Sequence, residues 1–409
     1  MLKFEKYLIE AKNTHLEHIE DLIFNEGVVG TRKAIFFLRD LRDMLAGHSN
    51  SKKDVTVKWD GAPAIFVGVD PEDGKFFVAK KGLFNKTPKM YKTNADIDAE
   101  LSGDLNAKFK VALENFSKLG LTKGVYQGDL MFTTGDVKTE TIDGDKYYTF
   151  QPNTIVYAVP VKSELGRKIN SAQIGVVWHT TYTGNAIADM KASFGKDIAS
   201  KMNDVSSVWQ TDATYRDLTG NAVFTDTETQ KLDLILSNIG KVFRKVPAGL
   251  LNTISSNEEL KMRIKTYNNT FVRAGKGFNL RTHTKGLMNY IHDFYQKEID
   301  SKKSQDSKNK WTEKRKDLMS VFSKYTKKNF DDMFQMMNLM ISAKEAIINK
   351  MNHASQIGTF LRTRNGFKVT DQEGFVAIDQ LSNDAIKIVN RLEFSRANFS
   401  SDVIKGWEK

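Results

Sequence analysis

The spacing of apolar and polar positions changes twice along the chain. In residues 1–50 apolar side chains recur at helical intervals, and Asn25-Glu26-Gly27 separates two helices, the second with Thr31 as its N-cap. From residue 54 apolar positions alternate, and turns such as Pro71-Glu72-Asp73-Gly74 separate short runs. We therefore predict a helix over 103–119 and strands over 55–59, 64–69, 76–82, 124–132, 147–150, 154–161 and 174–182.

Helical spacing returns between residues 226 and 355, where a methionine-rich run over 333–341 is typical of core filling. Strand-like runs follow at 367–369, 374–378 and 385–389. The pattern predicts an α+β fold in which a helical insertion interrupts a mostly antiparallel core. The expected parts are an N-terminal helical segment (1–50), the first part of the core (51–225), the insertion (226–355) and the last core strands (356–409).

Length and composition narrow the class of protein. A chain of 409 residues suits two to three domains, and the lack of cysteine excludes disulfides, zinc–thiolate sites and cysteine nucleophiles. The sequence has no run of eighteen apolar residues, and its first residues carry acids within the apolar pattern and lack a cleavage site. We expect a soluble cytoplasmic protein without a membrane partner; the sequence does not indicate its oligomeric state.

The net charge of +11 fits a protein that contacts phosphate backbones, and equally a lysine-rich soluble protein. Residues 301–328 hold ten lysines and arginines against three acids, together with Trp311 and Tyr325. This stretch is interpreted either as a solvated helical face or as a nucleic-acid contact with stacking aromatics.

Candidate chemistry begins at Lys58-Trp59-Asp60-Gly61, a lysine at the end of a predicted strand and just before a turn. Lysine attacks phosphorus only as the neutral amine, so nearby cations and desolvation must lower its pKa. Further short motifs follow in order, each with a glycine, acid, base or aromatic residue in a strand: Lys80-Lys81-Gly82, Tyr126-Gln127-Gly128-Asp129-Leu130, Ile174-Gly175-Val176-Val177-Trp178-His179, Glu373-Gly374-Phe375-Val376 and Lys387-Ile388-Val389-Asn390-Arg391. This order of motifs is much more specific than any one of them.

In these motifs the chain resembles the covalent nucleotidyltransferase superfamily of ATP-dependent DNA ligases, RNA ligases and mRNA capping enzymes. The resemblance covers residues 54–182 and 370–391. It implies an antiparallel, ATP-grasp-like ligase core, ATP and Mg²⁺ as cofactors, and nucleic-acid ends of RNA or DNA as partners. The chain also resembles proteins of large tailed phages that share the opening His15-Leu16-Glu17-His18, which would place it in the host cytoplasm.

The resemblance also implies a role for each matching residue. Lys58 would form a lysyl–AMP phosphoramidate, and Asp60 and Gly61 would shape the loop beside it. Lys81 would contact the ribose or the incoming end, Asp129 the ribose and the metal, and Glu373 the Mg²⁺. Adenine would stack on Trp178, or on Tyr157 as the competing choice. Lys387 would contact the α-phosphate, with Arg391 as a helper.

Several positions depart from the family pattern. Asp129 is one methylene shorter than the usual glutamate, Val389 stands in place of a second lysine, and Pro63 replaces the arginine of DNA ligases. Only about twenty residues follow the last motif, so we expect no C-terminal OB domain, which favours the RNA-ligase type. Physically, Lys58, Lys81, Lys387 and a cation held by Asp129 and Glu373 would neutralise charge during nucleotidyl transfer.

The leading hypothesis is a ligase that adenylylates Lys58 and then joins a 5′-phosphate to a 3′-hydroxyl. The alternatives are an AMP transferase that does not seal strands, and a non-catalytic nucleic-acid-binding protein on the same scaffold. His15 and His18, three residues apart on a helix, could bind a metal, but capping or core positions are favoured.

Overall fold

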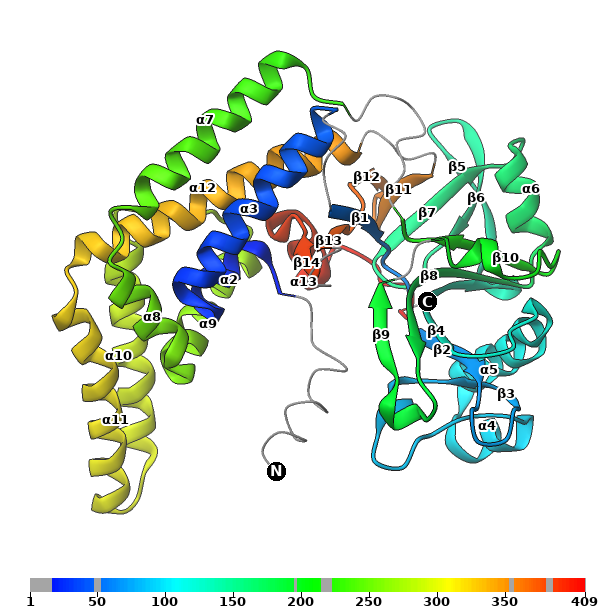
Figure 1. The fold of residues 1–409 in the computed structure, drawn as a ribbon, viewed down its shortest axis with the longest axis horizontal. Helices are drawn as coiled ribbons and strands as arrows, with labels where there is room; N and C mark the ends of the chain where they lie inside the picture. The colour runs from blue at the N-terminus through cyan, green and yellow to red at the C-terminus, as the bar shows by residue number, and fades with distance from the viewer. Residues whose placement is uncertain are drawn as a thin grey trace.

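The computed structural model describes residues 17–47, 53–194, 197–214, 223–352, 357–379 and 385–408. These residues form α-helices and mostly antiparallel sheets, which confirms the predicted α+β class. Two lobes lie side by side (Figure 1). The helical lobe contains residues 17–47 and 223–352, and the sheet lobe contains residues 59–214 and 357–370. In the described part of the chain, no helix is both long and apolar enough to cross a membrane.

The helical lobe joins the N-terminal segment and the insertion around one hydrophobic core. The core includes Leu38 and Leu41 from the first and Leu232, Leu236 and the buried methionines from the second. Capping boxes at Thr225 and Thr326 satisfy the first N–H groups of two long helices. Its elements are η2 (Ile19–Asp21), α2 (Leu22–Asn25), α3 (Gly27–Leu45), α7 (Asp226–Phe243), α8 (Ala248–Ser256), α9 (Glu258–Arg273), α10 (His283–Ser301), α11 (Gln305–Lys324) and α12 (Lys327–Met351).

The sheet lobe contains two sheets. One has the order β10-β8-β4-β2-β3, with β9 paired to β8, and the other has the order β12-β11-β7-β6-β5. The strands are β2 (Ala64–Val69), β3 (Phe76–Ala79), β4 (Val125–Thr133), β5 (Lys138–Ile142), β6 (Asp145–Phe150), β7 (Ile155–Pro160), β8 (Ile174–Thr183), β9 (Lys191–Phe194), β10 (Val208–Asp212), β11 (Gly358–Thr363) and β12 (Gly366–Val369). Helices α4 (Asn94–Glu100), α5 (Gly103–Phe116) and α6 (Glu164–Ser171) cover these sheets; α5 with η4 (Ser117–Leu119) matches the predicted helix over 103–119.

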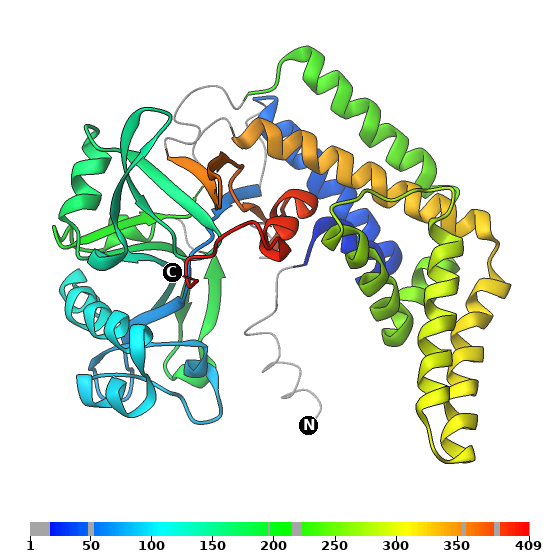
Figure 2. The same cartoon turned by 180° about the vertical axis from the view of Figure 1, so that it is seen from behind.

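A third sheet lies between the lobes. It has the order β1-β13-β14, from β1 (Lys53–Lys58), β13 (Gly374–Asp379) and β14 (Ala385–Ile388). One face, with Phe375 and Ile388, packs into the core of the helical lobe. Because side chains alternate along a strand, Lys58 and Lys387 project from the opposite face. Figure 2 shows this C-terminal part of the chain between the helices and the larger sheets.

Some predicted elements were wrong in detail. The predicted strand over 76–82 ends at Ala79, and η3 (Lys81–Phe84) is a 3₁₀ turn. Strands β5, β9, β10 and β11 were not predicted, because these short strands do not show a clear apolar alternation.

Candidate active site

Lys58 is the last residue of β1 and lies opposite Gly374 in β13, next to Glu373. Its ammonium group donates a hydrogen bond to Glu373 Oε1, and only 28% of the Lys58 side chain and 11% of the Glu373 side chain are exposed. Gly374 has φ of 144°, and a Cβ there would lie 2.6 Å from the carbonyl oxygen of Ile388. The glycine therefore permits the close strand pairing that places Glu373 beside the lysine.

The electrostatic environment of Glu373 is that of a buried carboxyl group with charged neighbours. Burial raises the pKa of Glu373 to about 7, the positive charge of Lys58 opposes this shift, and the acids Asp60 and Asp129 add to it. A carboxyl group with this pKa can hold or release a proton near neutral pH.

Asp129 approaches the same site from β4 in the sheet lobe. Burial raises the pKa of Asp129, while His179, Lys58 and Lys81 stabilise its charge. His179 Nε2 lies 3.8 Å from Asp129 Oδ2, and burial lowers the pKa of this histidine. Lys81, at the start of η3, is exposed at the edge of the cluster. No sequence motif predicted a role for His179, which lies two residues after Val177, the partner of Asp129 in the sheet.

The loop after Lys58 is held by a buried carboxylate. Asp60 accepts hydrogen bonds from Asn153 Nδ2 (2.6 Å) and from the backbone N–H groups of Thr154 (2.6 Å) and Ile155 (2.7 Å). Its own N–H donates to Tyr157 Oη at 2.7 Å. Burial raises the pKa of Asp60 to about 6, and these hydrogen bonds limit the shift. Asp60 therefore fixes the direction in which the chain leaves Lys58.

Gly61 is required because the loop after Lys58 lies very close to β4. A Cβ at this position would lie 2.5 Å from Asp129 Cβ, a separation that real structures do not tolerate. Gly61 thus allows the loop after the lysine to pack directly on β4 and keeps Asp129 close to Lys58.

The two aromatic candidates are not open to a ligand. Trp178 is fully buried in the sheet core, packs on Phe116 at 5.6 Å between ring centroids and donates Nε1–H to Gln210 at 2.9 Å. Tyr157 is also buried and packs against Trp59 at 5.1 Å. Trp178 lies on the face of β8 opposite His179, so the expectation that it stacks on adenine does not fit this geometry.

Lys387 and Arg391, the two basic residues expected at the site, lie in different environments. Lys387 lies near Lys58 on the shared face of the third sheet; burial lowers the pKa of Lys387, and the charge of Lys58 lowers it further. Arg391 instead turns toward the helical lobe, where its guanidinium binds Asp21 at 3.1 Å and Asn269 at 2.6 Å. Arg391 therefore connects the segment after β14 to the helical lobe and does not join the cluster around Lys58.

The structure describes only one member of the histidine pair. His15 lies outside the described residues; His18 is partly buried, and burial lowers its pKa well below the usual value. Within the described ranges, no group of three or more histidines and carboxylates could hold a metal ion. Glu373 and Asp129 are two carboxylates, and Mg²⁺ commonly uses one or two together with substrate phosphates and water. This pair therefore fits a cation that arrives with a nucleotide.

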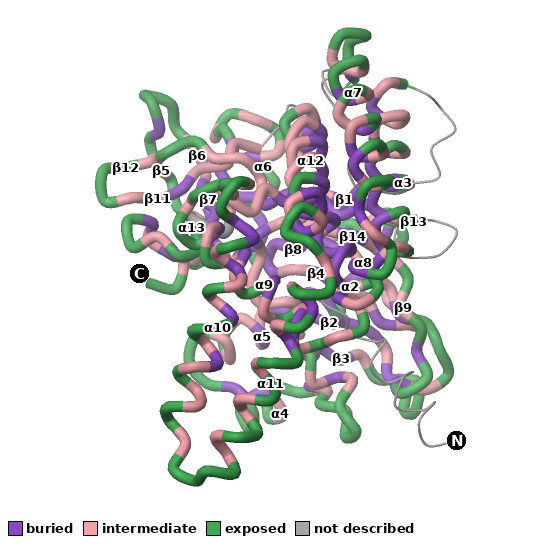
Figure 3. Tube along the Cα trace, turned by 90° about the vertical axis from the view of Figure 1, so that its left-hand side faces the viewer, coloured by how far each residue is buried: buried purple, intermediate pink, exposed green. Residues whose placement is uncertain are grey.

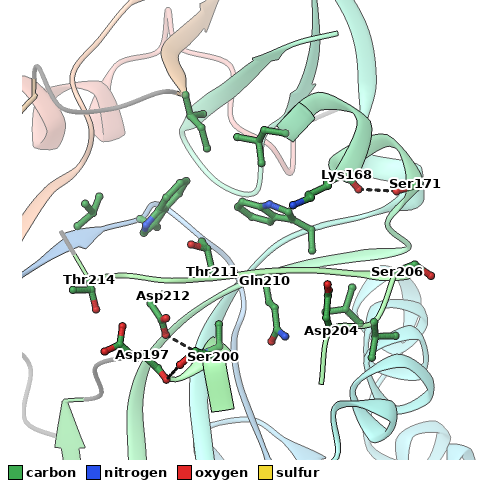
Figure 4. A pocket seen from close by; sticks show the side chains of 18 of the residues that line it. Lys168, Ser171, Asp197, Ser200, Asp204, Ser206, Gln210, Thr211, Asp212 and Thr214 are labelled. Atoms are coloured by element: carbon green, nitrogen blue, oxygen red, sulfur yellow. Dashed lines mark hydrogen bonds between the residues drawn. The ribbon is translucent and has the colours of Figure 1, made fainter. Parts of the chain in front are cut away.

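A pocket with a volume of about 760 Å³ lies along the edge strand β10 (Figure 4). Its lining includes Val57 and Trp59, the neighbours of Lys58 in sequence, together with Gln210, Asp212 and Lys168. Val57 and Trp59 alternate with Lys58 along the chain, and none of the charged residues around the Lys58 amine lines this pocket. The pocket is therefore separate from the lysine–carboxylate cluster.

Comparison with known proteins gives one family. A family model described as a family of unknown function, DUF6267, matches residues 13–403, which is nearly the whole chain. No curated protein and no solved structure matches the sequence or the fold. The chain belongs to this DUF6267 family.

Proposed function

We propose that the protein is an ATP-dependent polynucleotide ligase that works through a covalent lysyl–AMP intermediate on Lys58, with RNA ends as the first substrates to test. The observation that carries the proposal is the Lys58–Glu373 pair, to which Asp129 and Lys387 are added from two other strands. A lysine from β1, a carboxylate just before β13, a second carboxylate from β4 and a second lysine from β14 form a set suited to nucleotidyl transfer.

In the first step the neutral amine of Lys58 attacks the α-phosphorus of ATP. The N–P bond forms, the bond from the α-phosphorus to the pyrophosphate oxygen breaks, and pyrophosphate leaves. Glu373 is in hydrogen-bond contact with the amine and accepts its proton. Lys387 and Lys81 supply positive charge to the phosphates. Mg²⁺, held by Glu373 or Asp129, would neutralise phosphate charge when bound.

In the later steps AMP passes from Lys58 to a 5′-phosphate end, and a 3′-hydroxyl then displaces AMP to seal the strand. The Asp60 hydrogen bonds support the proposal because they hold the nucleophile loop in one position. The burial of Trp178 and Tyr157 means that adenine must be held by other contacts.

The test is incubation of the purified protein with α-³²P-labelled ATP and Mg²⁺. We expect a label that survives denaturation and is released by acid, absent from Lys58→Ala and retained by Lys75→Ala, which changes an exposed lysine in the β2–β3 turn. A label that is lost on addition of 5′-phosphorylated RNA, with formation of joined product, supports sealing. Absence of label with ATP in the wild-type protein would refute the proposal.

A further inference from the structure

The positive charge of the protein is concentrated in one lobe. Residues 223–352 contain 24 lysines and arginines and 14 aspartates and glutamates, a net charge of +10. Residues 17–47, the other part of the helical lobe, contain 4 and 6, so the lobe carries +8 of the total of +11. Residues 53–214, which include most of the sheet lobe, contain 20 of each and are neutral. The excess charge is therefore a property of the helical lobe and not of the lysine-rich composition of the whole chain.

Within this lobe the hairpin formed by α10 and α11 is the most exposed part (Figure 3). Only Leu318 and Val321 are buried along the twenty residues of α11. Lys303, Lys310 and Lys314 are exposed and have no carboxylate partner in the described part of the chain. Folding of the hairpin thus leaves Lys303 and Lys310 without a carboxylate among the described residues, and Lys314 beside an aromatic ring only, so no described carboxylate competes with an external anion for these ammonium groups.

Trp311, the tryptophan of the hairpin, already packs against neighbouring side chains. The Trp311 ring packs near Tyr295 at 5.8 Å between centroids, and the ammonium groups of Lys302 and Lys314 lie 4.8 Å and 4.7 Å from its centroid. A ring covered in this way does not offer a stacking platform for a base. Recognition by this surface would therefore rest on charge and would be independent of sequence.

We propose that the α10–α11 hairpin binds the phosphate backbone of the nucleic acid whose ends are joined. This inference rests on the proposed function and adds the surface that holds the polynucleotide. Lysines contact phosphates without reading bases, and each contact releases condensed counterions, so binding weakens steeply with salt. The surface lies outside the nucleotide site and therefore is not required for formation of lysyl–AMP.

The test measures binding of a fluorescent 20-nucleotide single strand by anisotropy between 50 and 300 mM KCl, without ATP. The variant Lys303→Gln/Lys310→Gln/Lys314→Gln is compared with Lys123→Gln/Lys146→Gln/Lys201→Gln, which removes three exposed lysines from the sheet lobe that also lack a carboxylate partner among the described residues. We expect the hairpin variant to lose about tenfold in affinity at low salt. We also expect its log–log salt slope to fall by about 2, since each single-strand phosphate contact contributes roughly 0.7.

Formation of lysyl–AMP by the same variants separates the two proposals. We expect the hairpin variant to label like the wild type, which also shows that it is folded, and the control variant to bind and label normally. Equal binding of the single strand by the hairpin and control variants would overturn the inference. Displacement of the fluorescent strand by poly-glutamate as effectively as by an unlabelled oligonucleotide would also overturn it. If the hairpin variant loses binding but even the wild-type protein never labels with ATP, the binding surface is upheld and the ligase proposal is refuted.

Discussion

The contact between Lys58 and Glu373 gives a sharp prediction for the first chemical step. Glu373→Gln keeps the size of the side chain but removes its capacity to accept the lysine proton. Loss of a positioned general base costs about 10²–10⁴ in rate, which corresponds to about 3–5 kcal/mol of transition-state stabilisation. We expect single-turnover formation of lysyl–AMP to slow by this factor.

The pH dependence follows from the pKa of about 7 for Glu373. Only the ionised carboxylate accepts a proton, so the wild-type rate should rise with pH and level off about one unit above the pKa. Glu373→Gln should lack this inflection. Because the pKa of Glu373 is raised from its usual value of 4.5, the group contributes fully to the free energy of unfolding below pH 4.5 and loses this contribution as pH rises through 7. The free energy of unfolding of Glu373→Gln should lack this pH dependence.

The assay is quenched labelling with α-³²P-ATP between pH 5.5 and 8.5 at rising Mg²⁺ concentration. If labelling of Glu373→Gln stays slow at saturating Mg²⁺, the variant has lost proton transfer and not merely cation binding. Asp129→Asn, which changes the other nearby carboxylate, is the control and should keep an inflection, moved to lower pH because Asp129 helps to raise the pKa of Glu373. The reasoning fails if Glu373→Gln labels at the wild-type rate with the wild-type pH profile.

Three further predictions concern the support of the site. Asp60→Ala leaves three donors without an acceptor and should lower the free energy of unfolding by about 3–5 kcal/mol, measured by urea denaturation; a loss below 1 kcal/mol would contradict the clamp. Lys344→Met strands the buried carboxylate of Glu20 and should cost about 3–5 kcal/mol, and adding Glu20→Gln should recover part of it in a double-mutant cycle. Trp178→Phe should lower the melting temperature but leave the ATP concentration for half-maximal labelling unchanged; a large rise would restore Trp178 as an adenine contact.

The position of the third sheet has a structural consequence for the site. Lys58 and Lys387 belong to strands that pack on the helical lobe, whereas Asp129 and His179 belong to the sheet lobe. Arg391, just after β14, binds Asp21 in the N-terminal segment, and the buried Lys344–Glu20 pair connects that segment to α12. Movement of one lobe relative to the other would therefore change the distances between the groups that surround the lysine.

The sequence by itself determined the α+β class, the helical character of residues 226–351 and the short motifs that contain Lys58, Asp60, Gly61, Asp129, Glu373 and Lys387. These follow from local properties: the period of apolar residues, turn residues, and acids or bases next to glycine in a strand. The order of the motifs predicted that distant residues would meet. Lys58 and Glu373, 315 positions apart, are in contact.

Only the tertiary structure decided which side of each strand faces the site. A shift of one residue reverses the face, so Trp178 lies in the core while His179, its neighbour, reaches Asp129. Arg391 follows β14, but its guanidinium donates a hydrogen bond to Asp21, near the other end of the chain, and therefore lies away from Lys58. Both outcomes depend on partners that are remote in sequence, and local spacing carries no information about them.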